Sequence, residues 1–589
     1  MKPTRLFDLL ENQLLSFPQK VCVAYKYNGT WKKFSTSDVN SIVNHLSLGL
    51  LSGGITEGDK VGIISANRPE WNFVDLALQQ IGAISVPMYP NSTEKDYAYI
   101  CRHSELKMVF VSDQKLAHSV KRALTSENLN EIHVYSFDKT ENTQHWKDLI
   151  KSGKNETVSR LHEMKAEVKP EDLFTIIYTS GTTGTPKGVM LTHDNVMSII
   201  RSTSDSFDIV NESWTALSFL PLCHIFARAV FFVDLFRGVS VYYAESMDTI
   251  SDNLKEVKPN YFATVPRLLE KVYDKILAKG YELSGAKKQI FFWAIRVGNS
   301  YQPGKKMSAF YNWQLKWARK LVFSKWKEAL GGNLSCIISG ASALQPRLVR
   351  IFGAAEILLC EGYGLTETSP TISIAKPYEE RIRPGYAGEL IDCVEVKIAD
   401  DGEILTRGPN VMMGYFKEPE LTAEVITKDG WFHTGDIGEL TDDGYLKITD
   451  RKKELFKTSG GKYIAPQPLE NKFKESILID QIMVVGNNRK YPAALIVPFF
   501  GGLREWCLLH DIPYTSDAEM IRHPEVKIKY DEEVGRLNEN FARFEQIKNY
   551  TLLSVPWSIE TDELTPTLKL KRRVVTENFT DAIELMYAE

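Results

Sequence analysis

A run of hydroxyl-bearing residues, glycines and one lysine at residues 178–188, YTSGTTGTPKG, has the composition of a polyphosphate-binding loop. Glycines allow a close approach of the backbone, exposed N–H groups donate to phosphate oxygens, and a lysine adds positive charge. A flexible surface loop is the alternative, but the run directly follows the apolar stretch FTII. The candidate nucleotide-binding residues in the run are Thr179, Ser180, Gly181, Thr182, Thr183, Gly184 and Lys187.

The residues around Lys187 argue against one large class of phosphate loops. The Walker A pattern of P-loop kinases and GTPases requires glycine before the lysine and a hydroxyl after it. Here Pro186 precedes Lys187 and Gly188 follows it. We expect a helix after the run, with Thr192 as its N-cap.

The whole run resembles the phosphate loop of the adenylate-forming superfamily, which comprises acyl-CoA synthetases, firefly luciferase and the adenylation domains of nonribosomal peptide synthetases. Further motifs of that superfamily follow in order, and the resemblance covers nearly the whole chain. Residues 340–342, GAS, resemble the turn that lines the adenine pocket, and residues 361–368, EGYGLTET, resemble the central motif. The resemblance implies nucleotide contacts from Gly340, Ala341, Ser342, Glu361, Gly362, Tyr363 and Thr366.

Three side chains of the central motif have chemistry that suits these roles. The resemblance implies that Tyr363 stacks on adenine, Thr366 contacts phosphate and Glu367 binds Mg²⁺. A flat ring suits a purine face, and a carboxylate suits a hard cation that bridges phosphates. Taken alone, Glu367 would be a solvated loop acid, but its place beside Thr366 after a strand favours the metal role.

Two aspartates are expected on the ribose side of the nucleotide and at a hinge. Residues 431–436, WFHTGD, resemble the segment whose aspartate, here Asp436, accepts both ribose hydroxyls. A carboxylate can accept two hydrogen bonds, which suits a cis-diol, whereas an aspartate in a hairpin turn is the alternative. Asp450 and Arg451 match the hinge motif, which implies a pivot at Asp450 and a ribose-side contact from Arg451.

Residues 564–572, LTPTLKLKR, resemble the loop that carries the catalytic lysine, and Lys569 aligns with that lysine. Many members of the superfamily have glycine before it, whereas this chain has Leu568, a departure that is common in the long-chain fatty acyl branch. Whether Lys571 shares the role stays open. Without the resemblance, a lysine in a basic run is usually a solvated surface residue.

The acyl substrate is expected near His224. Residues 220–226, LPLCHIF, resemble the turn that places a histidine or aromatic beside the substrate carboxylate, although a lone histidine is more often structural. Residues 265–271, VPRLLEK, are similar to the long-chain fatty acyl branch rather than to acetyl or aryl ligases. The candidate catalytic residues are therefore Lys569, Thr366, Glu367 and His224.

The resemblance implies a two-step reaction with ATP, Mg²⁺ and coenzyme A. A carboxylate oxygen is a poor leaving group, so a long-chain fatty acid first becomes acyl-AMP, and the thiol of coenzyme A then displaces AMP. Between the steps the C-terminal domain rotates, and Gly460 and Gly461 are expected near the thioester-forming face. The alternatives are a ligase that loads an acyl carrier protein, a CoA ligase for another acid, and a non-catalytic nucleotide-sensing scaffold.

The elements that must position these motifs alternate between apolar strands and helices. Strands are expected at 60–67, 84–89 and 108–113 and a helix at 71–83, a rhythm typical of an α/β sheet covered by helices. We predict an N-terminal domain at 1–450, with a small β-rich unit from about 385 to 450 where Gly and Asp turns separate short strands. A smaller, mobile α+β domain at 451–589 would carry the lysine loop.

The composition limits the class of protein further. The chain has 589 residues, 43% of them hydrophobic, and its 71 Lys and Arg against 75 Asp and Glu give a formal charge of −4. This balance argues against a nucleic-acid binder. Seven scattered cysteines without a CxxC spacing argue against a disulfide framework or a zinc site and favour a reducing compartment. With no signal-like N-terminus and no apolar run of ~18 residues, we expect a cytoplasmic protein of undetermined oligomeric state.

One segment departs from the overall balance. Residues 271–328 contain thirteen Lys and Arg, three Asp and Glu and twelve aromatic residues, so their charge is +10 and the rest of the chain sums to −14. Basic amphipathic helices of this kind can lie on anionic membranes. The alternative is a helical subdomain that packs its aromatic side chains into the core. Peripheral membrane contact through 271–328 is therefore a hypothesis.

Overall fold

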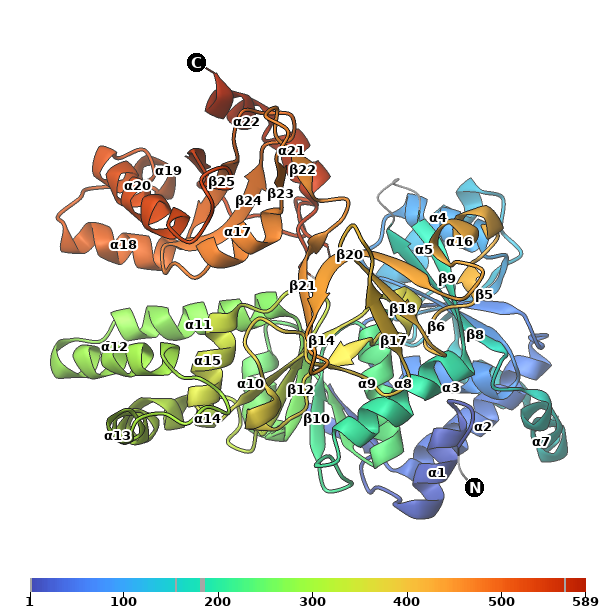
Figure 1. The fold of residues 1–589 in the computed structure, drawn as a ribbon. Coiled ribbons are helices and arrows are strands. Elements are labelled where there is room, and N and C mark those ends of the chain that lie inside the picture. Colours follow the sequence, from blue (N-terminus) through green and yellow to red (C-terminus); the bar gives the residue numbers. More distant parts are fainter. Residues whose placement is uncertain (1–2, 154–155, 181–185, 566–567, 589) are drawn as a thin grey trace.

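The computed structural model describes residues 3–153, 156–180, 186–565 and 568–588. Most of the chain forms a large α/β body, and the C-terminal residues form a smaller α+β domain that lies against it (Figure 1). Both features confirm the predicted fold class. Within the described residues, none of the helices combines the length and the apolar character that a membrane span requires.

The first sheet contains the strands predicted between residues 60 and 112. Its order is β19 (Gly414–Tyr415), β9 (Pro186–Thr192), β8 (Leu173–Ser180), β4 (Ile84–Met88), β3 (Lys60–Ile64), β5 (Leu106–Val111), β6 (His133–Ser136) and β7 (Gln144–His145). β3 pairs in parallel with both β4 and β5. The intervening helix α3 (Pro69–Gln80) is buried along its whole length, because it packs between this sheet and the second one.

The second sheet brings four of the predicted motifs to one edge. Its order is β16 (Glu389–Leu390), β15 (Ser373–Ile374), β14 (Leu358–Tyr363), β13 (Cys336–Ser339), β12 (Tyr261–Thr264), β10 (Thr215–Ser218), β11 (Ser240–Tyr243), β1 (Val23–Tyr27) and β2 (Thr30–Phe34). From β11 to β14, neighbouring strands pair in parallel. Their carboxyl ends therefore share one edge, where ligands bind in open α/β sheets.

The predicted β-rich unit is a four-stranded antiparallel sheet. It consists of β17 (Glu395–Ile398), β18 (Glu403–Arg407), β20 (Phe432–Leu440) and β21 (Leu446–Arg451). The last strand continues through the boundary that we predict between residues 450 and 451. The two domains are therefore joined directly by the end of this strand and not by a long linker.

The C-terminal domain has its own sheet and its own apolar cores. The sheet comprises β24 (Ile479–Val485), β25 (Ala493–Pro498) and β26 (Asn549–Leu552), and the helices of the domain include α17 (Pro466–Phe473), α18 (Phe500–Leu509) and α20 (Pro524–Asn538). Among the described residues, no apolar core cluster contains side chains from both sides of Asp450.

The phosphate-binding run connects two antiparallel strands, β8 and β9, and residues 181–185 lie outside the described residues. A strand thus follows the run where we expected a helix, because Val189 and Leu191 are buried on alternate positions of β9. The helix α8 (His193–Ser206) begins one strand later. Thr192 is its N-cap, as predicted, since the N–H of Asn195 donates to Thr192 Oγ1 at 3.1 Å.

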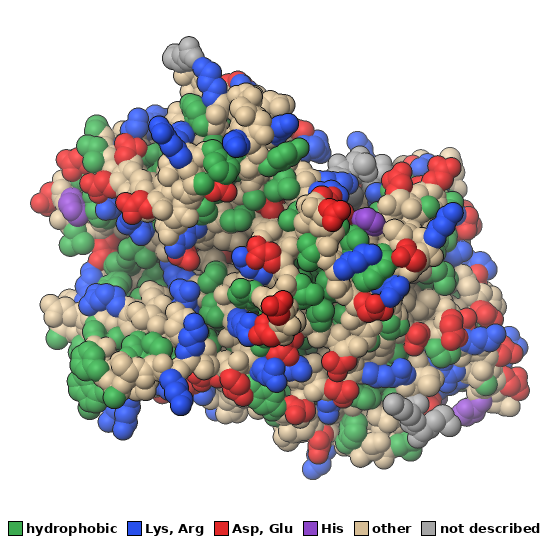
Figure 2. Space-filling model, in the orientation of Figure 1, with side chains coloured by type: hydrophobic (Ala, Val, Ile, Leu, Met, Phe, Trp, Pro, Cys, Tyr) green, Lys and Arg blue, Asp and Glu red, His purple; other side chains and the backbone are tan. Residues whose placement is uncertain are grey.

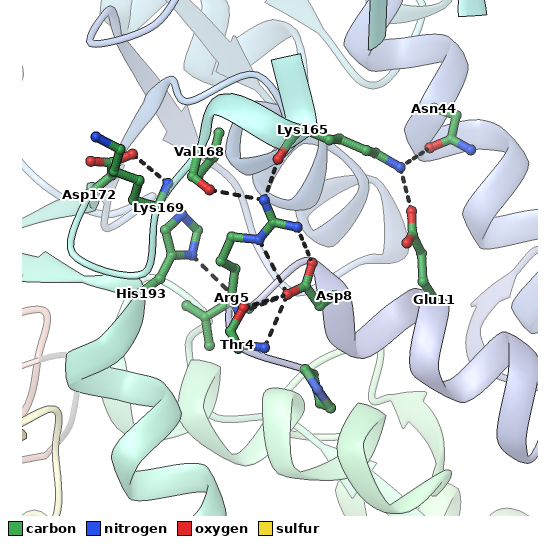
Figure 3. Close-up of polar contacts among 12 residues, drawn as sticks. Thr4, Arg5, Asp8, Glu11, Asn44, Lys165, Val168, Lys169, Asp172 and His193 are labelled. Atoms are coloured by element: carbon green, nitrogen blue, oxygen red, sulfur yellow. Dashed lines mark hydrogen bonds and ion pairs between the residues drawn. The ribbon is translucent and has the colours of Figure 1, made fainter. Parts of the chain in front are cut away.

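Residues near the N-terminus contact the segment before β8 and the first residue after β9 (Figure 3). Arg5 Nη1 donates to the carbonyl of Val168 at 2.9 Å, and Arg5 Nη2 pairs with Asp8 Oδ1 at 2.9 Å. The N–H of Leu6 donates to His193 Nδ1 at 3.4 Å. Burial lowers the pKa of His193 to about 3, so its ring is a neutral acceptor at pH 7. The first residues thereby fix the base of the phosphate-binding hairpin.

A fully buried ion pair joins two helices to the first sheet. Arg228 on α9 (Ile225–Arg237) donates through Nε to Asp75 Oδ2 at 3.0 Å, and neither side chain is exposed. Its two terminal nitrogens also donate to Thr175 Oγ1 at 2.8 Å and to Ser85 Oγ at 2.9 Å. Burial raises the pKa of Asp75 and lowers that of Arg228, so each charge depends on its partner.

Candidate active site

Two predicted motifs meet through the side chains of Tyr363 and Asp436. Tyr363 ends β14, and its hydroxyl donates to Asp436 Oδ2 at 2.8 Å, although 73 residues separate them in the sequence. Arg451 Nε lies 3.4 Å from the other oxygen of the same carboxylate, Oδ1. Burial raises the pKa of Asp436, and Arg451 and Tyr363 oppose that rise. The aromatic ring, the acid and the hinge arginine thus form one polar cluster.

The turn after Tyr363 is tightly packed and carries Thr366 and Glu367. A Cβ at Gly364 would lie 1.8 Å from the carbonyl oxygen of Pro370, so only glycine fits between the strand and the turn. Thr366 and Glu367 then lie in a single 3-10 turn, η3 (Thr366–Thr368), and both are half-buried. The close approach of Pro370 fixes where this turn presents its side chains.

Glu367 is held by a tyrosine that the sequence motifs do not include. The hydroxyl of Tyr415 donates to Glu367 Oε1 at 2.9 Å, and Lys187 Nζ lies 5.4 Å from the centre of the Tyr415 ring. Lys187 stands opposite Thr179 across the β8–β9 hairpin. Burial raises the pKa of Glu367, and the Tyr415 hydrogen bond opposes the rise. Tyr415 therefore links the acid to the base of the phosphate-binding run.

Glu367 has the properties that a magnesium ligand requires. Its side chain is a hard oxygen donor, which Mg²⁺ prefers, and it lies beside the phosphate-binding hairpin. Tyr415 donates to one oxygen, Oε1, and no hydrogen bond or ion pair among the described residues involves the other, which could bind a cation. Among the described residues, no group of three or more His, Cys, Asp or Glu forms a self-sufficient metal site. The residues present therefore fit an ion that arrives with a nucleotide.

Lys569 of the C-terminal domain reaches the same cluster. It is half-buried, and burial together with Arg451 lowers its pKa to about 8. Three carboxylates act in the opposite direction on that pKa, those of Asp436, Glu454 and Glu367. A cation from one domain is thus placed among the predicted ribose and metal ligands of the other.

The backbone around Lys569 explains why glycine is frequent at the preceding position. Leu568 has φ = 60°, in the left-handed region that side chains other than glycine rarely adopt. On either side, the N–H of Lys569 donates to Thr565 Oγ1 at 2.9 Å and the N–H of Thr565 to the carbonyl of Lys569 at 2.8 Å. Leu568 also packs against the apolar cluster around Trp557. That packing offsets the cost of its conformation.

Lys571 has a different environment from Lys569. Its ammonium group pairs with the exposed carboxylate of Asp562. The next residue, Arg572, pairs with Glu470 at 2.6 Å and Glu454 at 2.9 Å inside the C-terminal domain. These contacts direct Lys571 to the surface, which favours Lys569 as the catalytic lysine.

His224 lies in the loop that follows β10, where it caps α9. Its Nδ1 accepts the N–H of Phe226 at 3.2 Å. Burial and the positive charge of Lys569 lower its pKa to about 4, so the ring is neutral at pH 7. Asn67 braces the same turn by donating to the carbonyl of Leu220 at 2.7 Å and accepting the N–H of Leu222 at 3.0 Å. Asn67 was not among the predicted residues, because it lies about 150 residues earlier and in no motif.

The buried side chain of Glu361 accepts a hydrogen bond from the backbone next to the predicted adenine turn. Its Oε1 accepts the N–H of Leu344 at 2.9 Å, and burial raises its pKa to about 8. Ala341 in the same turn has φ = 71°, and Gly340 packs beside the ring of Phe226. Glu361 thus holds the turn at 340–344 next to the His224 loop, while its contact with the nucleotide stays a prediction.

Asp450 links the two domains, whereas Gly460 and Gly461 lie elsewhere. Asp450 Oδ2 accepts the N–H of Gln467 at the start of α17 at 3.0 Å, and burial raises its pKa to about 6. The two glycines belong to the exposed turn between β22 (Phe456–Lys457) and β23 (Tyr463–Ile464). Gly461 donates to the carbonyl of Thr458 within that turn. The structure therefore does not bring the glycines into the Lys569 cluster.

Polar contacts hold the C-terminal domain in this orientation. Arg267 Nη2 donates to Asp480 Oδ2 at 3.0 Å, and Arg347 Nη2 donates to the carbonyl of Lys474 at 3.1 Å. A third contact pairs Lys288 with Glu505. Arg267 belongs to the VPRLLEK segment, which sequence comparison alone would assign only to a branch of the superfamily. Its structural role is to fasten the two domains together.

The fold and this cluster define a nucleotide-dependent adenylating enzyme, and comparison with known families agrees. Residues 10–416 match the family model of the AMP-binding enzymes, and residues 454–589 match that of the AMP-binding enzyme C-terminal domain. The chain therefore belongs to the AMP-binding enzyme family. It is an AMP-forming adenylating ligase that resembles acyl-CoA ligases and uses ATP and a carboxylic acid.

Its curated relatives are similar over most of their length. The chain is 32% identical over 579 residues to the long-chain-fatty-acid–CoA ligase FadD15 of Mycobacterium bovis, with 97% of this chain and 95% of the relative covered. It is 31% identical over 558 residues to the human long-chain-fatty-acid–CoA ligase 1, with 90% and 78% covered.

Solved structures share the fold at lower identity. The anthranilate CoA ligase AuaEII in complex with anthranoyl-AMP superposes with a TM-score of 0.74 at 18% identity, over 98% of each chain. ATP-bound MatB from Rhodopseudomonas palustris superposes with a TM-score of 0.73 at 20% identity, over 98% of this chain and 99% of that one. These structures support the fold assignment of both domains.

Proposed function

We propose that the protein converts a long-chain fatty acid and ATP to acyl-AMP and pyrophosphate, and then transfers the acyl group to coenzyme A with release of AMP. The observation that carries this proposal is the position of Lys569. A lysine from the C-terminal domain lies beside Arg451 at the domain boundary and near Asp436 and Glu367 of the N-terminal domain, which is where negative charge develops when a carboxylate attacks the α-phosphorus.

Each side chain of the cluster has a part in that first step. Tyr363 presents a ring to adenine, and Asp436 accepts the ribose hydroxyls once the nucleotide replaces its contact with the Tyr363 hydroxyl. Lys187, with residues 179–184, binds the phosphates that leave. Lys569 stays charged below pH 8 and stabilises the charge on the α-phosphate. Mg²⁺, when bound by the free oxygen of Glu367, supplies charge neutralisation at the phosphates.

The neutral ring of His224 suits a gate beside the acyl carboxylate. Because its pKa is about 4, it does not compete with Lys569 for the negative charge at pH 7. It can donate from Nε2 while Nδ1 stays bound to Phe226. The long-chain preference and the use of coenzyme A rest on the similarity to the long-chain ligases.

The second step requires Lys569 to withdraw, and Asp450 is the proposed pivot. Asp450 lies at the end of β21 and binds the first turn of α17, so a rotation there moves the whole C-terminal domain. The polar contacts made by Arg267 and Arg347 would open, and the exposed turn with Gly460 and Gly461 could then face the acyl-AMP. We thus propose that the smaller C-terminal domain rotates about the end of β21.

Incubation of the protein with ATP, Mg²⁺ and palmitate, with and without coenzyme A, tests the proposal. We expect pyrophosphate release in both cases and palmitoyl-CoA only with coenzyme A. Pyrophosphate without thioester would indicate loading of a carrier protein instead, and no pyrophosphate would indicate a nucleotide-sensing scaffold. Comparison of kcat/KM for acids of increasing chain length tests the acyl preference, and a higher value for acetate than for palmitate would overturn it.

A further inference from the structure

The helix α13 (Ala309–Ala318) and the π-helical turn after it, η2 (Arg319–Phe323), expose a stripe of large apolar side chains. Phe310 is 68% exposed, Trp313 58%, Trp317 41% and Leu321 42%. Their spacing of three, four and four residues places them on one face of the helix. The rings of Phe310 and Trp313 stack on each other, with centroids 6.1 Å apart. We name these four residues the outer stripe.

The opposite face of the same helix is buried, so the stripe is not a consequence of loose packing. Leu315, Ala318, Val322 and Phe323 pack into the core of the second sheet, and Trp326 follows them in the next helix, α14 (Ser324–Ala329). An amphipathic surface helix normally has one apolar face and one polar face. This helix is apolar on both faces, and only the inner one has a partner among the described residues.

We considered two alternatives for the basic segment at 271–328, membrane contact and packing into the core. The burial pattern shows that different parts of the segment follow different alternatives. Helices α11 (Pro266–Tyr281) and α12 (Gly285–Asn299) contribute Tyr273, Leu277 and Phe291 to the core, as the packing alternative predicts. The outer stripe behaves differently. All eleven tryptophans lie among the described residues, and Trp313 and Trp317 are the two whose side chains are exposed.

The stripe lies in the most one-sided charge environment of the sequence. Residues 283–327 contain ten Lys and Arg and no Asp or Glu. Among the described contacts, four exposed lysines around the stripe make no ion pair, Lys305, Lys306, Lys316 and Lys325. Lys320 lies over the ring of Trp317 at 5.5 Å. Figure 2 shows hydrophobic side chains bordered by Lys and Arg at the lower left, where α13 lies in Figure 1.

We infer that the outer stripe and its lysines dock the enzyme on an anionic lipid bilayer. Tryptophan rings prefer the interface between headgroups and acyl chains, and lysines beside them can reach lipid phosphates. If a second copy of the chain covered the stripe with its own stripe, the unpaired lysines of the two copies would face each other and repel. The lipid surface instead supplies both an apolar layer and the opposite charge.

The docking surface stands on exposure and charge, and only its purpose rests on the proposed function. A long-chain fatty acid is concentrated in membranes because of its apolar chain, so an enzyme held at the bilayer meets it there. The hypothesis of membrane contact through 271–328 is thus restricted to α13 and η2. The helices α11 and α12 of the same segment pack into the core instead.

Co-sedimentation with vesicles of phosphatidylcholine, with and without phosphatidylglycerol, tests this inference on the full-length protein without any need for catalysis. We expect binding that requires phosphatidylglycerol, weakens with added salt and shifts the tryptophan emission to shorter wavelength. The W313Q/W317Q variant should bind at least tenfold more weakly, and K316E/K320E should lose roughly tenfold at low salt. A control, L15Q/L585Q, removes two apolar residues elsewhere that are even more exposed than the tryptophans, and it should bind like the wild type.

Pyrophosphate release with a short, water-soluble fatty acid separates this inference from the proposed function. All variants should keep that activity, which also shows that they fold. Vesicle binding that is absent, or equal in W313Q/W317Q and the control, would overturn the docking surface even if the enzyme is active. Concentration-dependent dimerisation that W313Q/W317Q abolishes would assign the stripe to a second copy instead. A wild-type protein that binds vesicles but releases no pyrophosphate would contradict the proposed function and leave the docking surface unaffected.

Discussion

The hydroxyl of Tyr415 lies 2.9 Å from Glu367 Oε1 and fixes one oxygen of the carboxylate that we propose as the Mg²⁺ ligand. The two residues come from separate elements, β19 and η3, and meet beside the ring contact between Tyr415 and Lys187. This pair therefore couples the orientation of a metal ligand to the phosphate-binding hairpin.

Tyr415→Phe should weaken the dependence of adenylation on metal. Loss of a hydrogen bond to a charged group costs about 1.5–3 kcal/mol, and without it burial raises the pKa of Glu367 further. We expect the Mg²⁺ concentration for half-maximal pyrophosphate release to rise about tenfold. Tyr445→Phe removes a comparable bond, to Glu389, outside the site and serves as the control. An unchanged Mg²⁺ dependence in Tyr415→Phe would contradict the role.

Lys569→Ala should abolish adenylation and largely spare thioester formation from supplied acyl-AMP. Removal of one group that stabilises transition-state charge typically costs about 10²–10³ in rate. Lys571→Ala should change either half-reaction less than about threefold, because Lys571 pairs with an exposed carboxylate at Asp562, and surface pairs contribute little. Equal loss of both half-reactions in Lys569→Ala would refute the assignment.

The pH dependence of adenylation should report the Lys569 ammonium group. Its pKa is lowered from 10.5 to about 8, so the charged form is present below that pH and is lost above it. We expect the rate to fall as the pH rises through about 8, approaching tenfold per pH unit. His224, with a pKa of about 4, should contribute no step between pH 5 and 7.

Two variants identify the group responsible for that step. Lys569→Arg should remove the decline near pH 8, because arginine stays protonated. Glu361 also has a pKa of about 8, so Glu361→Gln is the matched control and should keep the decline. A profile that Glu361→Gln flattens and Lys569→Arg does not would assign the step to the adenine turn.

The left-handed backbone at Leu568 gives a prediction with an internal control. Leu568→Gly suits φ = 60° and should leave adenylation within about threefold of the wild type, although it removes some apolar packing. Leu568→Val is smaller yet β-branched and is strained at that φ, at a cost of about 1–3 kcal/mol. It should therefore lower the rate about tenfold or more. Equal rates in the two variants would show that the backbone conformation does not matter to the lysine.

Arg228→Met should destabilise the large domain. It leaves the buried carboxylate of Asp75 without its partner, which typically costs about 3–5 kcal/mol. The urea midpoint of the domain should fall clearly, and adding Asp75→Leu to Arg228→Met should restore part of it. Arg383→Met breaks the exposed pair with Asp443 and should cost less than about 1 kcal/mol. A similar effect of the two single variants would contradict the role of burial.

Sequence patterns predicted the parallel strands β3, β4 and β5 because each is a short apolar run. The strand β9 was not predicted, since glycine and proline at 186–188 obscure its alternation. Tyr415 and Asn67 were not predicted either, because their partners lie 48 and more than 150 residues away and neither residue belongs to a motif. Local pattern thus locates loops, and only the folded chain reveals which side chains hold them.

The separation of the apolar cores has a thermodynamic consequence for the proposed rotation. Polar contacts from Arg267, Arg347 and Lys288 fasten the domains, and no core cluster of the described residues crosses Asp450. Exposure of apolar surface raises the heat capacity, and exposure of polar surface lowers it by less per unit area. Opening this interface should therefore occur with little change in heat capacity, so the balance between the two orientations would follow a nearly straight van't Hoff line over the range in which the protein is folded.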